Sequence, residues 1–364
     1  MTVAASAEPV TWDDGLQGFV VSGFDEAAQV LRGPGWSSDP RALGGDVFAA
    51  VPPGVLLFMD PPDHTRLRRL LSPAFTPRAL ERFRPRVAAV VETVLDGLFA
   101  EADEADLMAE AAYLIPLALI AELLDVGTEG AQVFRAETPG LVRMLEVTPT
   151  AEDIERGARA SNELMLFLLP LLTERRRRPG DDFVSALLRM PELEPEEVMA
   201  TCVLLLAAGH ETTANLIGNG ALALMRDRSQ VPALHAGPSR AVEELLRAET
   251  PVKLAGRAAL TDHDLGGTHV PAGSRVVIRV DAANRDPRHW PDPGRLDLAR
   301  TPQPHLAFGA GHHYCLGAAL ARLEATEALP RLFARFPNLT TTDPQPHWRP
   351  SSTFHGLAAL HVRP

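Results

Sequence analysis

The chain has 364 residues, 46% of them apolar, and its formal net charge at pH 7 is −12. This size allows a large buried core, while the acidic charge argues against nucleic acid as a partner. Two cysteines are too few for a disulfide scaffold, and no apolar run reaches the roughly 18 residues that cross a bilayer. The first residues lack the basic and apolar parts of a secretory signal. We therefore expect a soluble, cytoplasmic protein with no membrane partner, in which residues 1–364 form one domain.

The N-terminal part predicts a short strand, a helix and a long loop. Gly18–Val21 has the composition of a strand, and Asp25–Leu31 has that of a helix. Gly44–Phe58 is rich in proline and glycine and is expected to be a loop. Its apolar side chains, which include Leu56 and Phe58, indicate packing against a ligand or under a lid. Ordinary packing against the core explains them equally well.

A helix is expected to begin near Asp60-Pro-Pro, with Asp63 as its cap. His64 and Arg68 are four residues apart, so they share one face of this helix. Taken alone, the two residues read as an ordinary surface pair. Further helices are expected in Val87–Phe99, Ala111–Leu124 and Val133–Arg175, the last with a break at Pro149 and Thr150.

Pro195–Arg226 predicts a long buried helix, because its middle is apolar on every side. Polar residues and a glycine interrupt that middle at Gly209, Glu211 and Thr212. Glycine inside a helix costs roughly 1 kcal/mol relative to alanine, so packing alone does not explain the interruption. A zinc-protease motif is excluded, because the residue four after His210 is Ala214. The alternative for Thr212 is a hydrogen bond back to its own helix.

The segments that follow carry weaker signals. Ser239–Ala248 predicts a helix with Glu244 and Arg247 three residues apart, a spacing common on helix surfaces. Leu265–Val280 alternates around a Pro-Ala-Gly turn and predicts a β-hairpin. Ser351–Val362 reads as a strand near the C-terminus.

Residues 305–324 hold the second cysteine, Cys315, between a glycine-rich loop and a predicted helix that starts at Leu316. The N-terminus of a helix favours the thiolate form of a nearby cysteine, and a thiolate is a metal ligand. A lone cysteine is more often an inert buried residue. A zinc site lacks a second cysteine pair, and a dinucleotide loop is excluded because Tyr314 stands at the third glycine position.

The loop resembles the haem-binding loop of the cytochrome P450 monooxygenases. The residues that carry the resemblance have the family's spacing: Phe308, Gly309, Gly311, His313, Cys315 and Gly317. The resemblance implies a mainly α fold with a small β region and with haem b between the Pro195–Arg226 helix and the Cys315 loop. The chain departs from the family pattern in a short N-terminus and in Asp227–Arg240, which looks trimmed.

The same resemblance assigns roles to individual residues. Cys315 would be the axial thiolate on the haem iron, and Phe308 and Gly309 in the same loop would also bind the haem. The haem propionates would be held by four side chains: His64, Arg68, Arg257 and His313. Gly209 would leave room for dioxygen, Thr212 would hydrogen-bond it and Glu211 would help to relay protons. Glu244 and Arg247 would form a buried pair that braces the Cys315 loop.

The expected function is the insertion of one atom of dioxygen into an organic substrate. A bulky, mainly apolar substrate is expected, because the candidate pocket residues are mostly apolar: Leu56, Phe58, Ala208, Val252, Leu254 and Phe354. Electrons would come from a ferredoxin with its reductase, which would dock near Arg66 and Arg69, although a solvated face also explains these arginines. The alternative function is ligand binding or oxidative coupling without oxygen insertion. A peroxide-driven enzyme is disfavoured, because it does not need the Glu211–Thr212 pair.

Overall fold

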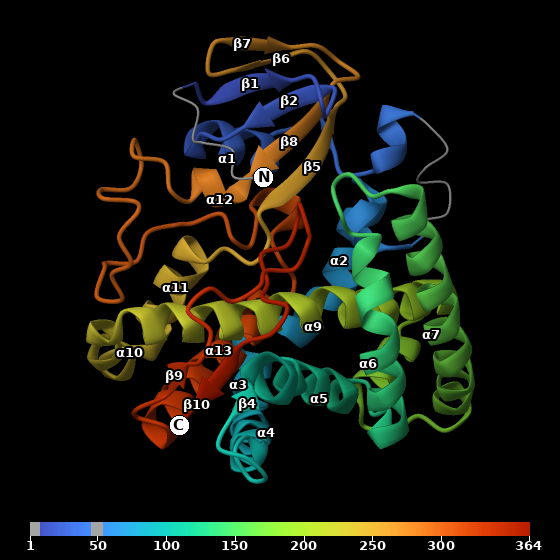
Figure 1. Cartoon of the computed structure of the whole chain (residues 1–364). Coiled ribbons are helices and arrows are strands. Elements are labelled where there is room, and N and C mark those ends of the chain that lie inside the picture. Colours follow the sequence, from blue (N-terminus) through green and yellow to red (C-terminus); the bar gives the residue numbers. More distant parts are fainter. Residues whose placement is uncertain (1–7, 45–53) are drawn as a thin grey trace.

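One long helix, α9 (Pro195–Arg226), crosses the centre of the molecule and most of the other helices pack around it (Figure 1). The computed structural model describes residues 8–44 and 54–364. The helix has the predicted bounds, and its middle is buried as predicted: Cys202 and Leu206 are both fully inaccessible to solvent. The part of the predicted Gly44–Phe58 loop that spans residues 45–53 lies outside the described residues.

In chain order, the other α-helices are α1 (Phe24–Arg32), α2 (Asp63–Leu71), α3 (Pro77–Glu81), α4 (Arg84–Gly97), α5 (Leu114–Leu123), α6 (Gly127–Arg143), α7 (Ala151–Arg177), α8 (Phe183–Leu188), α10 (Val231–Ala236), α11 (Pro238–Ala248), α12 (Val280–Ala283) and α13 (Ala318–Arg335). Six of them (α5, α6, α7, α8, α11 and α13) make the main helix contacts with α9, whereas α1 and α12 lie beside the largest sheet (Figure 1). The predicted break near Thr150 is confirmed, because the Thr150 side chain and Asp153 form a capping box that starts α7. Among the described residues, no helix is long and apolar enough to cross a membrane.

The strands form three small sheets. They are β1 (Val10–Asp13), β2 (Gly18–Val21), β3 (Trp36–Ser37), β4 (Ala105–Asp106), β5 (Leu254–Ala259), β6 (His263–Leu265), β7 (Thr268–Val270), β8 (Arg275–Arg279), β9 (Thr340–Thr341) and β10 (His361–Arg363). The largest sheet has the order β1-β2-β8-β5-β3, so strands from the N-terminal part of the chain lie beside strands from residues 254–279 (Figure 1). The predicted mainly α fold with a small β region is confirmed.

Three local predictions are wrong. Strand β7 pairs with β6, and β8 pairs with β2 and β5, so Leu265–Val280 is not one hairpin. Three consecutive β8 residues, 276–278, are buried, and such a run suits a central strand rather than a half-exposed hairpin. In Ser351–Val362 only the last residues join a strand. Asp63 is the first residue of α2 and Pro62 holds the cap position, without a side-chain cap.

A buried ion-pair network holds α11 against the chain that leads to the Cys315 loop. Arg247 donates to both carboxylate oxygens of Glu244 at 2.8 Å, and Arg300 donates to Glu244 Oε1 at 3.1 Å. Arg247 also donates to the carbonyl oxygens of Asn284 and Pro293. The predicted Glu244–Arg247 pair is therefore formed and buried, and Arg300 is a third member that the sequence did not indicate.

Removing Arg247 is expected to destabilise the fold strongly, because Glu244 would keep a buried charge with one partner fewer. For Arg247→Ala we expect a loss of about 3–5 kcal/mol in the free energy of unfolding, measured by urea denaturation. The matched control is Arg156→Ala, which breaks the exposed i,i+4 pair with Glu152 and should cost less than about 0.5 kcal/mol. Equal losses in the two variants would contradict the structural role of the buried network.

Candidate active site

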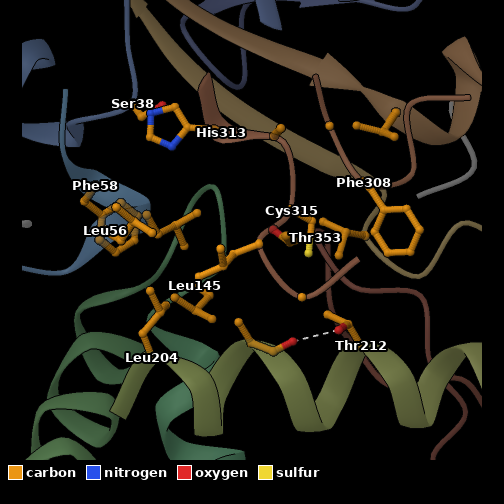
Figure 2. Close-up of a pocket in the computed structure, with 18 of the residues that line it drawn as sticks. Ser38, Leu56, Phe58, Leu145, Leu204, Thr212, Phe308, His313, Cys315 and Thr353 are labelled. Atoms are coloured by element: carbon orange, nitrogen blue, oxygen red, sulfur yellow. Dashed lines mark hydrogen bonds between the residues drawn. The ribbon is translucent and has the colours of Figure 1, made fainter. Parts of the chain in front are cut away.

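A cavity of about 410 Å³ separates α9 from the Cys315 loop. Figure 2 shows Cys315 and His313 on the loop side and Thr212 on α9, with apolar side chains that include Leu145 and Leu204 at one side of the cavity. The cavity wall contains every residue that was predicted to contact a substrate: Leu56, Phe58, Ala208, Val252, Leu254 and Phe354. The six residues therefore line one cavity, and their contact with a substrate stays a prediction.

The backbone of the Cys315 loop is folded so that the sulfur faces this cavity. The Cys315 N–H donates to the carbonyl oxygen of Phe308 at 2.8 Å, and Gly309 and Gly311 have φ values of 68° and 69°. These values are in the left-handed region that favours glycine. A Cβ atom on Gly311 would also lie 2.4 Å from the carbonyl oxygen of Leu31. The glycines are therefore needed for the turn and for its close contact with α1.

The helix after the cysteine begins later than predicted, at Ala318 rather than Leu316, so residues 316 and 317 separate Cys315 from the helix. Burial raises the pKa of the Cys315 thiol, while the Gly317 N–H and the charges of Arg68 and Arg322 oppose this effect. The Cys315 side chain itself is exposed on the cavity side, so its sulfur is accessible to a ligand. A cation bound to the sulfur would reverse the balance.

Glu243 on α11 clamps both ends of the Cys315 loop. Its carboxylate accepts two hydrogen bonds from Arg322, at 2.6 and 3.0 Å, and lies 3.3 Å from His305 Nε2. Burial opposes ionisation, but the hydrogen bonds of His305 and Arg322 prevail and lower the pKa of Glu243 to about 2. Arg322 in turn lies over the Phe308 ring at 4.4 Å. This contact could not be predicted from the sequence, because Glu243 lies far from His305 and Arg322 in the chain.

Four basic side chains gather on the rim of the cavity, as the resemblance implied: His64, Arg68, Arg257 and His313. The rings of His64 and His313 are 4.1 Å apart. Burial, together with neighbouring positive charges, lowers the pKa of His64 to about 4 and that of His313 to about 3. Burial also lowers the pKa of Arg257 to about 10.

The two arginines of this group have no ion-pair partner in the described part of the chain. Neither Arg68 nor Arg257 forms an ion pair with a described carboxylate, although Asp60 exerts a weaker attraction on Arg257. Both ring nitrogens of His64 are buried without a hydrogen-bond partner. Buried polar atoms and charges are normally paired. The residues therefore fit a group that brings negative charge into the cavity, as the two propionates of haem would.

The ligand chemistry of the site fits the same group. Within residues 8–44 and 54–364 no cluster of three or more histidine, cysteine, aspartate or glutamate side chains could hold a metal ion. A single sulfur such as that of Cys315 can still serve a metal whose other ligands come from a macrocycle. The donor set thus suits haem and does not suit a metal held by protein ligands alone.

The α9 wall of the cavity contains Gly209 and Thr212. Thr212 Oγ1 donates to the Ala208 carbonyl oxygen at 2.7 Å (Figure 2), which is the helix back-bond considered as the alternative. A Cβ atom on Gly209 would lie 2.8 Å from Ile120 Cδ1. Glycine here therefore also allows α5 to pack closely against α9. The predicted oxygen-binding roles of both residues stay predictions.

Glu211 differs from its neighbours because it does not line the cavity. Its carboxylate accepts hydrogen bonds from Arg349 Nη1 at 2.9 Å and from the Tyr113 hydroxyl at 3.3 Å. Burial and the negative charge of Glu211 raise the pKa of Tyr113. The Arg349 side chain is 35% exposed. Any proton that Glu211 passes to the cavity must therefore come from this partly exposed cluster, whose arginine and tyrosine the sequence did not single out.

The carboxylate of Glu146, in the turn after α6, binds the C-terminal segment that lines the cavity. Glu146 accepts hydrogen bonds from the hydroxyls of Ser351 and Ser352 and from the Thr353 N–H. The Val147 N–H donates to Thr353 Oγ1 at 2.8 Å. Because the turn and Thr353 both line the cavity, these bonds join the α6–α7 connection to the C-terminal segment over the site.

One further acid, Glu324 on α13, lines the cavity without a described partner for its buried Oε2 atom. Burial raises the pKa of Glu324 from 4.5 to about 8. The folded protein therefore holds a proton on this carboxyl group through neutral pH, whereas the unfolded chain has already lost it.

The raised pKa predicts a specific dependence of stability on pH. Between pH values of about 4.5 and 8 the folded state binds the extra proton, so Glu324 destabilises the fold increasingly as pH rises through this window. Glutamine cannot ionise. The free energy of unfolding of Glu324→Gln, relative to the natural chain, should thus increase by roughly 1–3 kcal/mol between pH 5 and pH 8 in urea titrations. The exposed Glu163→Gln variant is the control, and a constant difference for Glu324→Gln would refute the argument.

The comparisons with known proteins agree with this geometry. The family described as Cytochrome P450 matches residues 17–236 and 225–357, and the two matches meet in the segment predicted to be trimmed. The cytochrome P450 monooxygenase PikC from Streptomyces venezuelae is 38% identical over 98% of this chain and 88% of its own length. The 6-deoxyerythronolide B hydroxylase from Saccharopolyspora erythraea is 35% identical over 96% and 91%.

A solved structure gives the same result for the fold. P450BioI in complex with hexadec-9Z-enoic acid ligated acyl carrier protein has a TM-score of 0.91 and 33% identity, covering 98% of this chain and 95% of that chain. A cysteine facing a cavity rimmed by unpaired cations is what a haem-thiolate protein requires. The chain belongs to the cytochrome P450 family, and it is a monooxygenase of that family.

Proposed function

We propose that this monooxygenase inserts one atom of dioxygen into a bulky, largely apolar organic molecule of the secondary-metabolite type. The observation that carries the proposal is the cavity itself. Cys315 and Thr212 line the same cavity, and most of the other side chains in its wall are aliphatic. Such a surface gains free energy by burying apolar substrate and excludes water from the reacting groups. The relative named for hydroxylation of 6-deoxyerythronolide B supports a substrate of this kind.

The family implies haem b, and the residues on the cavity wall fit it. Cys315 would hold the iron, and His64, Arg68, Arg257 and His313 would neutralise the propionates. Bound haem would supply the activation of dioxygen. The protein's part is to keep the sulfur in place, to position the substrate against the apolar wall and to deliver protons.

Proton delivery would use neighbouring residues of α9. The Thr212 hydroxyl can leave its bond to the Ala208 carbonyl and donate a proton into the cavity, where general-acid catalysis needs one. Glu211, the adjacent residue, holds its carboxylate among Arg349 and Tyr113 outside the cavity. A relay from the partly exposed Arg349 side through Glu211 to Thr212 Oγ1 would bring protons in without opening the cavity to water.

Two electrons have to come from outside, and a ferredoxin with its reductase is the proposed source. Arg66 suits docking less than expected, because it is paired with Glu197 and donates to the Glu192 carbonyl oxygen at 3.0 Å. Arg69 is exposed and forms no ion pair with another described residue. It is therefore the better of the two candidate contacts for an acidic partner.

The decisive experiment follows heavy oxygen from labelled dioxygen into the product. A panel of lipids, terpenoids and polyketides is first titrated for the spectral change that follows loss of water from the iron, in protein whose reduced carbon monoxide spectrum shows thiolate ligation. The tightest ligand is then turned over with a ferredoxin and its reductase. We expect one labelled oxygen atom per product molecule. Product without label would favour the alternative, a haem protein that binds ligands or couples substrates oxidatively without oxygen insertion.

Replacing Thr212 by alanine should separate electron use from product formation. The variant loses the hydroxyl that would hold a proton at the cavity, so we expect product per reducing equivalent to fall by about tenfold or more, with hydrogen peroxide rising in its place. The matched control is Thr201→Ala, because Thr201 makes the same kind of back-bond on α9, to the Glu197 carbonyl oxygen at 2.7 Å, but does not line the cavity. Unchanged coupling in Thr212→Ala would remove the threonine from the proposed relay.

A further inference from the structure

A second cavity of about 520 Å³ adjoins the cavity that faces Cys315. We call it the outer chamber, and the first cavity the inner chamber. The outer chamber lies between α6, α7 and the N-terminal half of α9. The two chambers share four wall residues, each contributing a side chain to both: Phe58, Met144, Leu145 and Leu204. The division between the chambers is thus formed by residues that line both spaces.

The lining of the outer chamber is almost wholly aliphatic. It includes Leu172, Met165, Met199 and Val203, and methionine side chains adapt readily to different shapes. Its polar side chains are few: Ser161, Thr173, Arg176 and Glu196. Ser161 is buried, whereas the other three are exposed. Most of the polar side chains therefore lie at the outer rim of the chamber, and its interior favours the binding of apolar groups.

Two leucines of α7 connect the outer chamber with the surface. Leu166 and Leu169 line the chamber, yet 65% and 56% of their surfaces are exposed. Leucines that line an apolar space and also meet solvent gain free energy when a ligand covers them. Together with the shared wall, they form a series of apolar side chains that extends from the surface at α7 to the inner chamber.

We propose that the outer chamber is the binding site for the distal part of the substrate, and that the substrate is an elongated molecule with an alkyl or acyl chain. This inference rests on the proposed function. The inner chamber must hold the porphyrin as well as the carbon that reacts, so only part of it remains for substrate. A chain that leaves this space passes Phe58 and Leu204, enters the outer chamber and places its polar end near the exposed rim at Arg176.

The proposal can be tested with 1-alkylimidazoles that range from ethyl to dodecyl. The imidazole nitrogen binds haem iron and shifts its main absorption band, so the titration reports only ligand whose head is at the iron. Each methylene that becomes buried should tighten binding by about fourfold. With the outer chamber in use, affinity should keep rising to decyl and dodecyl. An affinity that stops rising at butyl would overturn the proposal.

Variants place the effect in the outer chamber. Ala200→Phe puts a ring into the chamber wall and should abolish the gain for the long chains, while ethylimidazole binds unchanged. Should Ala200→Phe fail to fold, the exposed double variant Leu166→Ser/Leu169→Ser serves, with an expected two- to fivefold loss for dodecylimidazole only. The matched control is Leu260→Ser, which is 53% exposed and lines neither chamber. Equal losses in control and double variant would refute the assignment.

The outcome of this test is separate from that of the proposed function. Binding of ethylimidazole and the carbon monoxide spectrum show whether the iron site is intact, whatever the effect of chain length. If the affinity did not depend on chain length, the proposed role of the outer chamber would be wrong, whereas the proposal of oxygen insertion would be unaffected. Product without labelled oxygen would remove oxygen insertion, and a rising response to chain length would still assign the chamber to an elongated ligand.

Discussion

The position of one sulfur atom depends on ion pairs that lie outside the cavity it faces. Glu243 contacts both His305 and Arg322, one on each side of Cys315. Asn284 accepts the Leu306 N–H at 2.7 Å, and its own carbonyl oxygen accepts from Arg247. The loop is therefore fixed from α11 and from the segment before it. Glycines give the loop its shape, and this buried polar network gives it its place.

The cavity wall is electrostatically incomplete in the chain alone. Burial, together with the positive charges on the rim, lowers the pKa values of His64 and His313, and burial raises the pKa of the Cys315 thiol. An anionic macrocycle with a central cation would correct both imbalances at once, since its propionates pair with the rim and its metal stabilises the thiolate. Folding and cofactor binding are for this reason expected to be thermodynamically linked.

Much of this site could be predicted from the sequence, because its main elements are local. The Cys315 loop and the polar interruption of α9 are each contiguous, and helical spacing places His64 beside Arg68. The partners that complete these elements could not be predicted. Arg349, Tyr113 and Glu243 reach the site through tertiary packing, and their neighbours in the sequence do not indicate these contacts. The hairpin prediction failed for a related reason, because strand alternation does not reveal which strand is the partner.

The C-terminal stretch 349–354 touches three parts of the catalytic centre. Arg349 donates to the Glu211 carboxylate on α9. Ser351, Ser352 and Thr353 donate to the Glu146 carboxylate in the turn after α6, and Phe354 lines the cavity. Under the proposed function, the same few residues would therefore affect both substrate selectivity and the efficient use of reducing equivalents. Evolution toward a new molecule by drift in this stretch would at first waste reductant, until compensating changes arose elsewhere. Engineers who diversify the stretch would meet the same trade-off, and would do better to vary it together with its contacts.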